Sequence, residues 1–394
     1  MKKLEYKKGL ESNIWKYYIY QFFAGFWLIS PILVIFYLAN NTNYLQLGSI
    51  ESIGLLALIL FEIPSGAFAD IVGRKTSMFL GLLLASTELL LIGYGANYLA
   101  FMIAAFLGGI GGSLISGADT SLLYDSLKEI KKEKLFQKIK GRANAITYFS
   151  VVIASLLGSF IYAKNNALVF YINGFIFILG GLFCIMFKEP RLDSIKFNLK
   201  NQFKHIKDSF SYLFKTKKLL WFSLFSIVSG GFISLFHNIL VQPYFEWLGY
   251  DIAIFGILVA TIFIIRSVVS LISYSIEQKL GEKLSLYIIV VLQAIFFFVM
   301  AYLNALWLFL LVVLLYSVWS YQEIIMDNYM HQHMNSKQRA TLHSISSFFK
   351  SIIMIIAFMA FGYIIDITSI AFSMYVLSFG SLILGLSFLL GVRK

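Results

Sequence analysis

The stretch that decides the fold runs from Glu62 to Lys75 and reads Glu62-Ile-Pro-Ser-Gly-Ala-Phe-Ala-Asp-Ile-Val-Gly-Arg-Lys75. It lies between two apolar runs, 53–61 and 78–94, so it predicts two membrane helices joined by a tight turn. Gly73 allows the chain to turn sharply. The Arg74-Lys75 pair that follows favours a turn on the cytoplasmic side of the membrane.

The spacing of five residues in this stretch resembles a known family signature. Gly66, Asp70, Gly73, Arg74 and Lys75 reproduce the pattern Gly-x-x-x-Asp-x-x-Gly-Arg-Lys. This pattern resembles the loop between the second and third helices of the major facilitator superfamily, a group of secondary transporters. The preceding Glu62-Ile-Pro-Ser-Gly66 resembles a bacterial and archaeal subgroup of drug-efflux type. The resemblance implies an all-α membrane protein with twelve transmembrane helices in two pseudo-symmetric six-helix bundles.

Composition independently indicates an integral membrane protein. Of 394 residues, 59% are hydrophobic and 13% are charged, and the mean hydropathy is +0.80, which excludes an ordinary soluble domain. The formal charge of +12 does not indicate nucleic acid, because the cations cluster in loops on one side of the membrane. A single cysteine, Cys184, excludes an internal disulfide framework. The first apolar segment is long enough to span, which argues against a cleaved signal peptide.

A membrane-spanning helix needs about 20 mostly apolar residues. The sequence offers twelve such segments, at about 16–39, 47–69, 76–95, 97–124, 143–163, 167–187, 219–245, 252–275, 284–303, 304–328, 340–365 and 368–391. The connections on the expected outer side contain one basic residue, Lys164, whereas the other Lys and Arg residues fall almost entirely on the inner side. This asymmetry predicts a multi-pass plasma (inner) membrane protein with both termini in the cytoplasm.

The longest polar break divides the predicted spans into two groups of six. We expect an N-terminal bundle at 1–187, a cytoplasmic linker at 188–218 and a C-terminal bundle at 219–394. Apolar residues recur every three or four positions in the linker, which favours an amphipathic surface helix over a disordered linker. The bundles look like a repeat, because 280–283 (Leu-Gly-Glu-Lys) is a decayed copy of 72–75 (Val-Gly-Arg-Lys).

Ionisable residues inside the apolar segments are the candidates for binding substrate or protons, because a charge in hydrocarbon normally faces a cavity or a partner. Asp119 and Glu323 lead this set, and hydrogen bonding between helices is the structural alternative for both. His237 could titrate near neutral pH. The other candidates are Gln21, Arg266 and Asp327. Arg266 is expected to pair with a carboxylate that the sequence does not identify. Glu88 and Lys350 have no assigned role.

A second predicted set lies at the cytoplasmic ends of the helices. The stretch 116–128 resembles the fourth helix of the same subgroup. The resemblance implies a gate in which Asp125 and Arg142 act beside Asp70 and Arg74. The remaining members of the signature set are Glu62, Gly66, Gly73 and Lys75. The alternative is a group of exposed surface pairs, each worth about 0–1 kcal/mol.

These observations predict a secondary transporter that moves a small solute by alternating access. The resemblance favours proton-coupled export of amphipathic or aromatic compounds. Two departures weaken drug/proton antiport: Ala105 stands where proton-driven members often carry arginine, and 154–159 lacks the Gly-Pro motif of drug exporters. Uptake of a sugar, amino acid or similar nutrient is the main alternative, and a membrane-embedded lipid-modifying enzyme is a remote one. We expect a monomer with no enzyme activity, metal, cofactor or nucleic-acid partner.

Overall fold

The computed structural model describes residues 2–95, 97–191, 216–332 and 339–391, and within these ranges every regular element is helical. Nine helical stretches in them are long and apolar enough to cross a membrane, and 168–184 is a shorter apolar helix. The stretch Ile252–Tyr302 holds two of the predicted spans. With the first span, which is formed by the end of the 23-residue helix Lys2–Ala24 and by the 7-residue helix Leu33–Ala39, the described chain accounts for all twelve. The predicted all-α, twelve-span fold is confirmed.

By contacts, the chain forms two compact units. The first comprises Met1–Thr42, Ser49–Phe197 and Ile252–Ala260, and the second comprises Asn43–Gly48, Asn198–Asp251 and Thr261–Lys394. The sharper division at 187 and 219 stays a prediction. The amphipathic linker helix was expected within 188–218, and residues 192–215 lie outside the described part of the chain.

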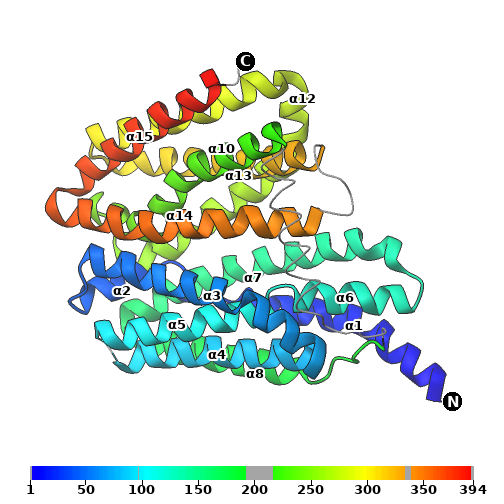
Figure 1. The fold of residues 1–394 in the computed structure, drawn as a ribbon. Helices are drawn as coiled ribbons and strands as arrows, with labels where there is room; N and C mark the ends of the chain where they lie inside the picture. Colours follow the sequence, from blue (N-terminus) through cyan, green and yellow to red (C-terminus); the bar gives the residue numbers. More distant parts are fainter. Residues whose placement is uncertain (1, 96, 192–215, 333–338, 392–394) are drawn as a thin grey trace. The chain divides into compact units, whose positions relative to one another are not determined.

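The first unit is built mainly from the helices that precede the linker. They are α1 (Lys2–Ala24), α2 (Leu33–Ala39), α3 (Tyr44–Val72), α4 (Arg74–Gly95), α5 (Tyr98–Ile115), α6 (Ala118–Glu129), η1 (Glu133–Leu135), α7 (Phe136–Lys164) and α8 (Leu168–Cys184). Within this unit α4 packs against both α5 and α8, while α1 packs against α6, α7 and α8 (Figure 1).

The second unit is built mainly from the helices that follow the linker. They are α10 (Lys217–Leu235), η2 (Phe236–Leu240), α11 (Val241–Trp247), η3 (Ile252–Ile254), α12 (Phe255–Tyr302), η4 (Leu306–Leu308), α13 (Phe309–Gln332), α14 (Arg339–Ile367) and α15 (Ile370–Gly391). The start of α12 and η3 belong to the first unit. In the second unit α10 packs against α13, α14 and α15.

Three predicted spans are interrupted in their interior. The first is interrupted between Ala24 and Leu33, where Gly25 approaches α7 so closely that a Cβ there would lie 2.9 Å from the Thr147 side chain. The fourth breaks at Gly117, whose φ of +77° suits glycine. The seventh contains the π-helical turn η2. Hydropathy identifies long apolar segments, but it does not detect these breaks. Each break interrupts the regular α-helix inside a membrane span.

Candidate functional site

The signature stretch is almost entirely helical. α3 continues through Pro64 to Val72, and α4 begins at Arg74, so the turn between them is the single residue Gly73. Gly73 has φ +106°, a backbone conformation that strongly favours glycine. Glu62 is half-buried, and Gly66 is exposed with open space around it.

Two acidic side chains hold the start of α4. The Glu189 carboxylate accepts hydrogen bonds from the backbone N–H of Arg74 (2.6 Å) and of Lys75 (3.2 Å). The Arg74 guanidinium forms an ion pair with Asp125 at the end of α6. Both ends of this pair are largely buried, with 22% and 14% of their side chains exposed. The predicted proximity of Arg74 and Asp125 is therefore present in the structure.

The other predicted gate residues are not members of this ion pair, although Asp70 lies near enough to Arg74 for electrostatic attraction. Asp70 is exposed in the last turn of α3, and Arg142 is exposed on α7. Within the described ranges, neither side chain forms an ion pair or a hydrogen bond. Asp125 is thus paired with Arg74 and not with Arg142. The gating role of the whole set stays a prediction.

The sequence analysis missed Glu189 because it lies beyond the sixth apolar segment, in the predicted linker. The segment that carries it is fastened to α1. Asn13 donates to the Lys188 carbonyl (2.8 Å) and accepts from the Lys188 N–H (2.9 Å). The Tyr6 hydroxyl donates to Glu129 (3.0 Å), which also accepts from the Arg191 N–H (2.9 Å). This strap, residues 188–191, therefore links α1 and α6 to the signature turn.

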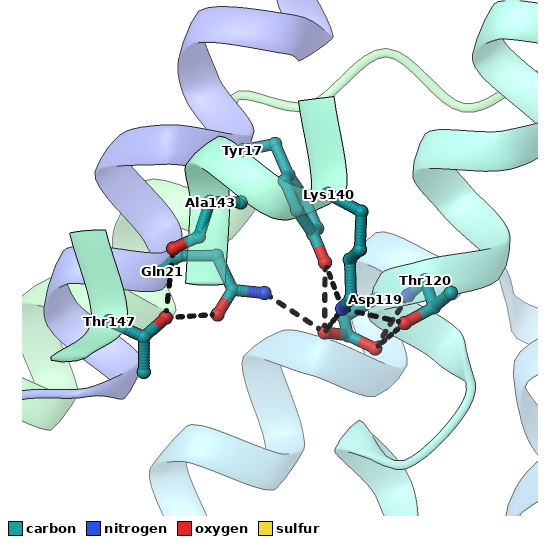
Figure 2. A network of polar contacts seen from close by, with 7 residues as sticks. All are labelled: Tyr17, Gln21, Asp119, Thr120, Lys140, Ala143 and Thr147. Carbon is teal, nitrogen blue, oxygen red and sulfur yellow. Dashed lines mark hydrogen bonds and ion pairs between the residues drawn. The ribbon is translucent and has the colours of Figure 1, made fainter. Parts of the chain in front are cut away.

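A polar network surrounds Asp119 in the first unit (Figure 2). The Asp119 carboxylate accepts from Gln21 (3.1 Å) and from the Tyr17 hydroxyl (3.3 Å), both on α1. Lys140 on α7 places its ammonium 3.8 Å from the same carboxylate. Lys140 also donates to Tyr17 (2.7 Å) and to Thr120 (3.1 Å). Asp119 is thus charge-compensated and hydrogen-bonded at a meeting point of three helices.

Lys140 is the central residue that the sequence analysis missed. The predicted fifth span began at 143, which assigned Lys140 to a basic inner loop. In the structure α7 begins at Phe136, so Lys140 lies in its second turn and reaches Asp119. Two features of the sequence could have indicated this: the unpaired Asp119 in the fourth span and a lysine within one turn of the fifth.

The network borders a cavity in the first unit, with a volume of about 490 Å³. Asp119, Thr120 and Lys140 line this cavity, and Glu88 of α4 lines it as well. Trp27 and Phe177 contribute aromatic rings, whose centroids lie 5.1 Å apart in an edge-to-face arrangement. A cavity of this size, mostly apolar with a few polar groups, is typical of small-molecule sites.

The second unit holds a separate charged cluster on α12 and α13. Arg266 forms an ion pair with Glu323 at 2.9 Å, so the sequence-predicted partner of Arg266 is Glu323. The guanidinium carbon also lies 4.5 Å from the Trp319 ring centroid, a cation–π geometry. The Glu323 side chain is 48% exposed, and such pairs contribute little stability, about 0–1 kcal/mol.

The remaining candidates have varied surroundings. His237 shares a 2.6 Å hydrogen bond with the Tyr316 hydroxyl in the second unit. Asp327 is exposed, and Lys350 is half-buried. Across the described chain, neither Asp327 nor Lys350 has an ion-pair partner, so the structure adds no role for them.

Comparisons with known proteins agree on the family. The model of the Major Facilitator Superfamily matches residues 21–358. The uncharacterized MFS-type transporter YxaM of Bacillus subtilis (strain 168) is 22% identical over 231 residues, which cover 57% of this chain and 56% of that protein. The quinolone resistance protein NorA of Staphylococcus aureus is 24% identical over 168 residues, which cover 43% of this chain and 42% of NorA. These matches span about half the length of the curated relatives.

A solved structure supports the fold over the whole chain. The nucleoside transporter NupG superposes with a TM-score of 0.80 at 14% identity, covering 99% of each chain. The family and its structural neighbours are transporters and not enzymes. The chain therefore belongs to the major facilitator superfamily.

Proposed function

We propose that this transporter exports amphipathic or aromatic compounds across the plasma membrane in exchange for protons, by alternating access. It would act as a monomer with both termini in the cytoplasm and with bundles at 1–187 and 219–394 joined by the linker 188–218. The observation that carries the proposal is the Asp119–Lys140 network beside a cavity that Trp27 and Phe177 also line.

The Asp119–Lys140 pair suits a proton-coupled step. Protonation of Asp119 removes the charge that attracts the Lys140 ammonium, 3.8 Å away. Lys140 would keep its hydrogen bonds to Tyr17 and Thr120, and Gln21 would still contact the neutral carboxyl. One proton can therefore change the charge at the cavity without dismantling the network.

The Arg74–Asp125 pair supports a gate on the cytoplasmic side of the first unit. It ties the start of α4 to the end of α6, and Glu189 ties α4 to the strap. In this proposal these contacts form in one transport state and break in another. Glu323 and Arg266 would form a second charged position that responds to protons or substrate.

The direction of transport is supported by the partial match to a relative named for quinolone resistance. The competing function is uptake of a polar nutrient by proton symport. The density of donors and acceptors around Asp119 favours this second candidate, because a polar solute could exchange hydrogen bonds with Gln21, Thr120 and Lys140.

Flux in everted membrane vesicles with an acidic lumen separates the two candidates. An exporter that exchanges solute for protons fills such vesicles with a hydrophobic dye, whereas a symporter drains its solute from them. We expect Asp119→Asn and Lys140→Met to lower proton-driven dye accumulation by roughly tenfold, equivalent to about 1.4 kcal/mol. Lys138→Met, an exposed change on the same helix, is the matched control. Absence of dye accumulation in wild-type vesicles would refute export.

A further inference from the structure

Glu88 is a carboxylate that the Asp119 network does not use. It lies on α4 and lines the cavity. Its carboxyl group is packed directly over Gly108 of α5, so that a Cβ at position 108 would clash with it. Within the described residues, Glu88 forms neither a hydrogen bond nor an ion pair. The packing fixes the carboxyl group in place, yet no protein group compensates its charge.

The charged neighbour that acts on Glu88 is another acid. Glu51 on α3 is near enough for electrostatic repulsion, and the buried Tyr37 ring of α2 is close to both carboxyl groups. Asp119 also lines the cavity, but Lys140 already compensates its charge. An ionised carboxylate in an apolar span without a partner is strongly unfavourable. Glu88 therefore needs either a proton or a positive ligand from the cavity.

The walls of the cavity that Glu88 lines suit an organic cation better than a metal ion. Leu82, Ala85 and Gly112 provide apolar surface, and Trp27 and Phe177 provide aromatic rings. Aromatic faces attract organic cations, and a carboxylate supplies the opposite charge. The volume of about 490 Å³ falls within the range of about 300–1,000 Å³ that is common for drug-sized ligands.

We propose that this cavity binds a lipophilic organic cation with its positive charge at Glu88, and that a proton on Glu88 replaces the cation when the cavity is empty. This inference rests on the proposed function and names its substrate class. It also gives Glu88 a role distinct from Asp119, because Glu88 recognises the charge of the substrate.

Isothermal titration of the purified full-length protein with tetraphenylphosphonium tests the proposal. Glu88→Gln should weaken binding by about tenfold or more, and Gly108→Ala should weaken it by displacing the carboxyl group. Glu88→Asp, which keeps the charge, should retain most of the affinity. Glu133→Gln removes an exposed carboxylate of η1 and should leave binding unchanged. Acidification should weaken binding to the wild type and should affect Glu88→Gln much less.

A neutral probe of similar shape, triphenylphosphine oxide, shows whether charge is what Glu88 recognises. Its binding should not depend on Glu88. Equal binding of tetraphenylphosphonium by wild type and Glu88→Gln overturns the inference, as does the absence of wild-type binding. The vesicle assay with a neutral dye tests the proposed function separately. Dye export together with binding indifferent to Glu88 would refute this inference alone.

Discussion

Gly73 and Gly281 occupy corresponding turns in the two halves of the chain, yet their surroundings differ. Both have positive φ, +106° and +75°. A Cβ at Gly73 would lie 3.3 Å from the Glu189 side chain, whereas nothing lies within 4 Å of the same position at Gly281. Lys279, Glu282 and Lys283 around the second turn are exposed and form no ion pair within the described ranges.

The difference separates two requirements that the sequence signature combines: a glycine for the backbone conformation of the turn, and charged residues for contacts with other helices. The glycine is retained in both turns because the backbone conformation requires it. Of these two turns, as far as the structure describes them, only the first has an ion pair, between Arg74 and Asp125, and Glu189 also accepts from the α4 backbone there. At the second turn, the Tyr329 hydroxyl donates to Glu277 (2.8 Å) and joins α13 to the preceding part of α12, while Ser285 and Tyr321 share a hydrogen bond (2.6 Å) that joins α13 to the following part. The first turn is thus held by an ion pair as well as by its backbone conformation, whereas the second keeps the glycine conformation without an ion pair in the described residues.

The largest expected difference between the two turns comes from removing a charged side chain at each of them. Arg74→Ala leaves Asp125 without its counter-ion in a largely buried position, at a cost of about 1.5–3 kcal/mol. We expect dye flux in vesicles to fall by roughly tenfold or more. Glu282→Ala at the second turn should change flux less than about twofold. Equal losses at both turns would show that the ionic cluster has no special role, provided that immunoblotting shows equal membrane insertion.

The glycines should show a smaller contrast. Gly73→Ala and Gly281→Ala both force a side chain into positive φ, which costs about 1–2 kcal/mol. Gly73→Ala should cost more, because its Cβ also presses on Glu189. Thermal unfolding in detergent measures this as a larger drop in melting temperature. A larger drop for Gly281→Ala would contradict the assigned difference in packing.

The contribution of the strap should be smaller again. Glu189→Gln keeps one oxygen that can accept from the Arg74 N–H, but it loses the second oxygen that accepts from the Lys75 N–H and removes the negative charge at the start of α4. Such charge is worth about 0.3–1 kcal/mol. The melting temperature should fall slightly, and raising the salt concentration should narrow the gap to wild type. A gap that salt leaves unchanged would point to packing instead of charge.

The smallest expected effect is a loss of stability at alkaline pH that depends on Tyr6. Burial, followed by the hydrogen bond to Glu129, raises the pKa of Tyr6 from 10.0 to about 12. The protonated hydroxyl is therefore favoured in the folded protein, and its contribution is complete below pH 10 and is lost as the pH rises towards about 12. Tyr6→Phe should flatten the decline in melting temperature over this window. An identical decline in both proteins would exclude Tyr6 as its cause.

The twelve spans could be predicted from the sequence, because apolar length and the positions of cations report directly on the membrane. The breaks at residues 25–32 and at Gly117 could not, since they depend on close packing and on backbone angles that hydropathy does not measure. Asp119 was identified by the cost of a charge in an apolar segment. Its partner Lys140 was missed because an error of two turns in the start of α7 moved it into a loop.

The paired charges show the same limit. Arg266 was expected to find a carboxylate, but only the structure identifies Glu323. Glu189 accepts hydrogen bonds from the start of α4 although it lies 115 positions from Arg74 in the sequence. No local sequence pattern predicts such a contact. Pairings between distant segments depend on how the helices pack, which a single sequence does not specify.

The break at Gly117 has an electrostatic consequence for its neighbour. It makes Asp119 part of the first turn of α6, where unpaired backbone N–H groups and the helix dipole create a positive potential. The carboxylate thus has a second source of stabilisation that does not depend on Lys140. A variant that removes the Lys140 charge therefore leaves Asp119 with backbone N–H groups that still stabilise its negative charge.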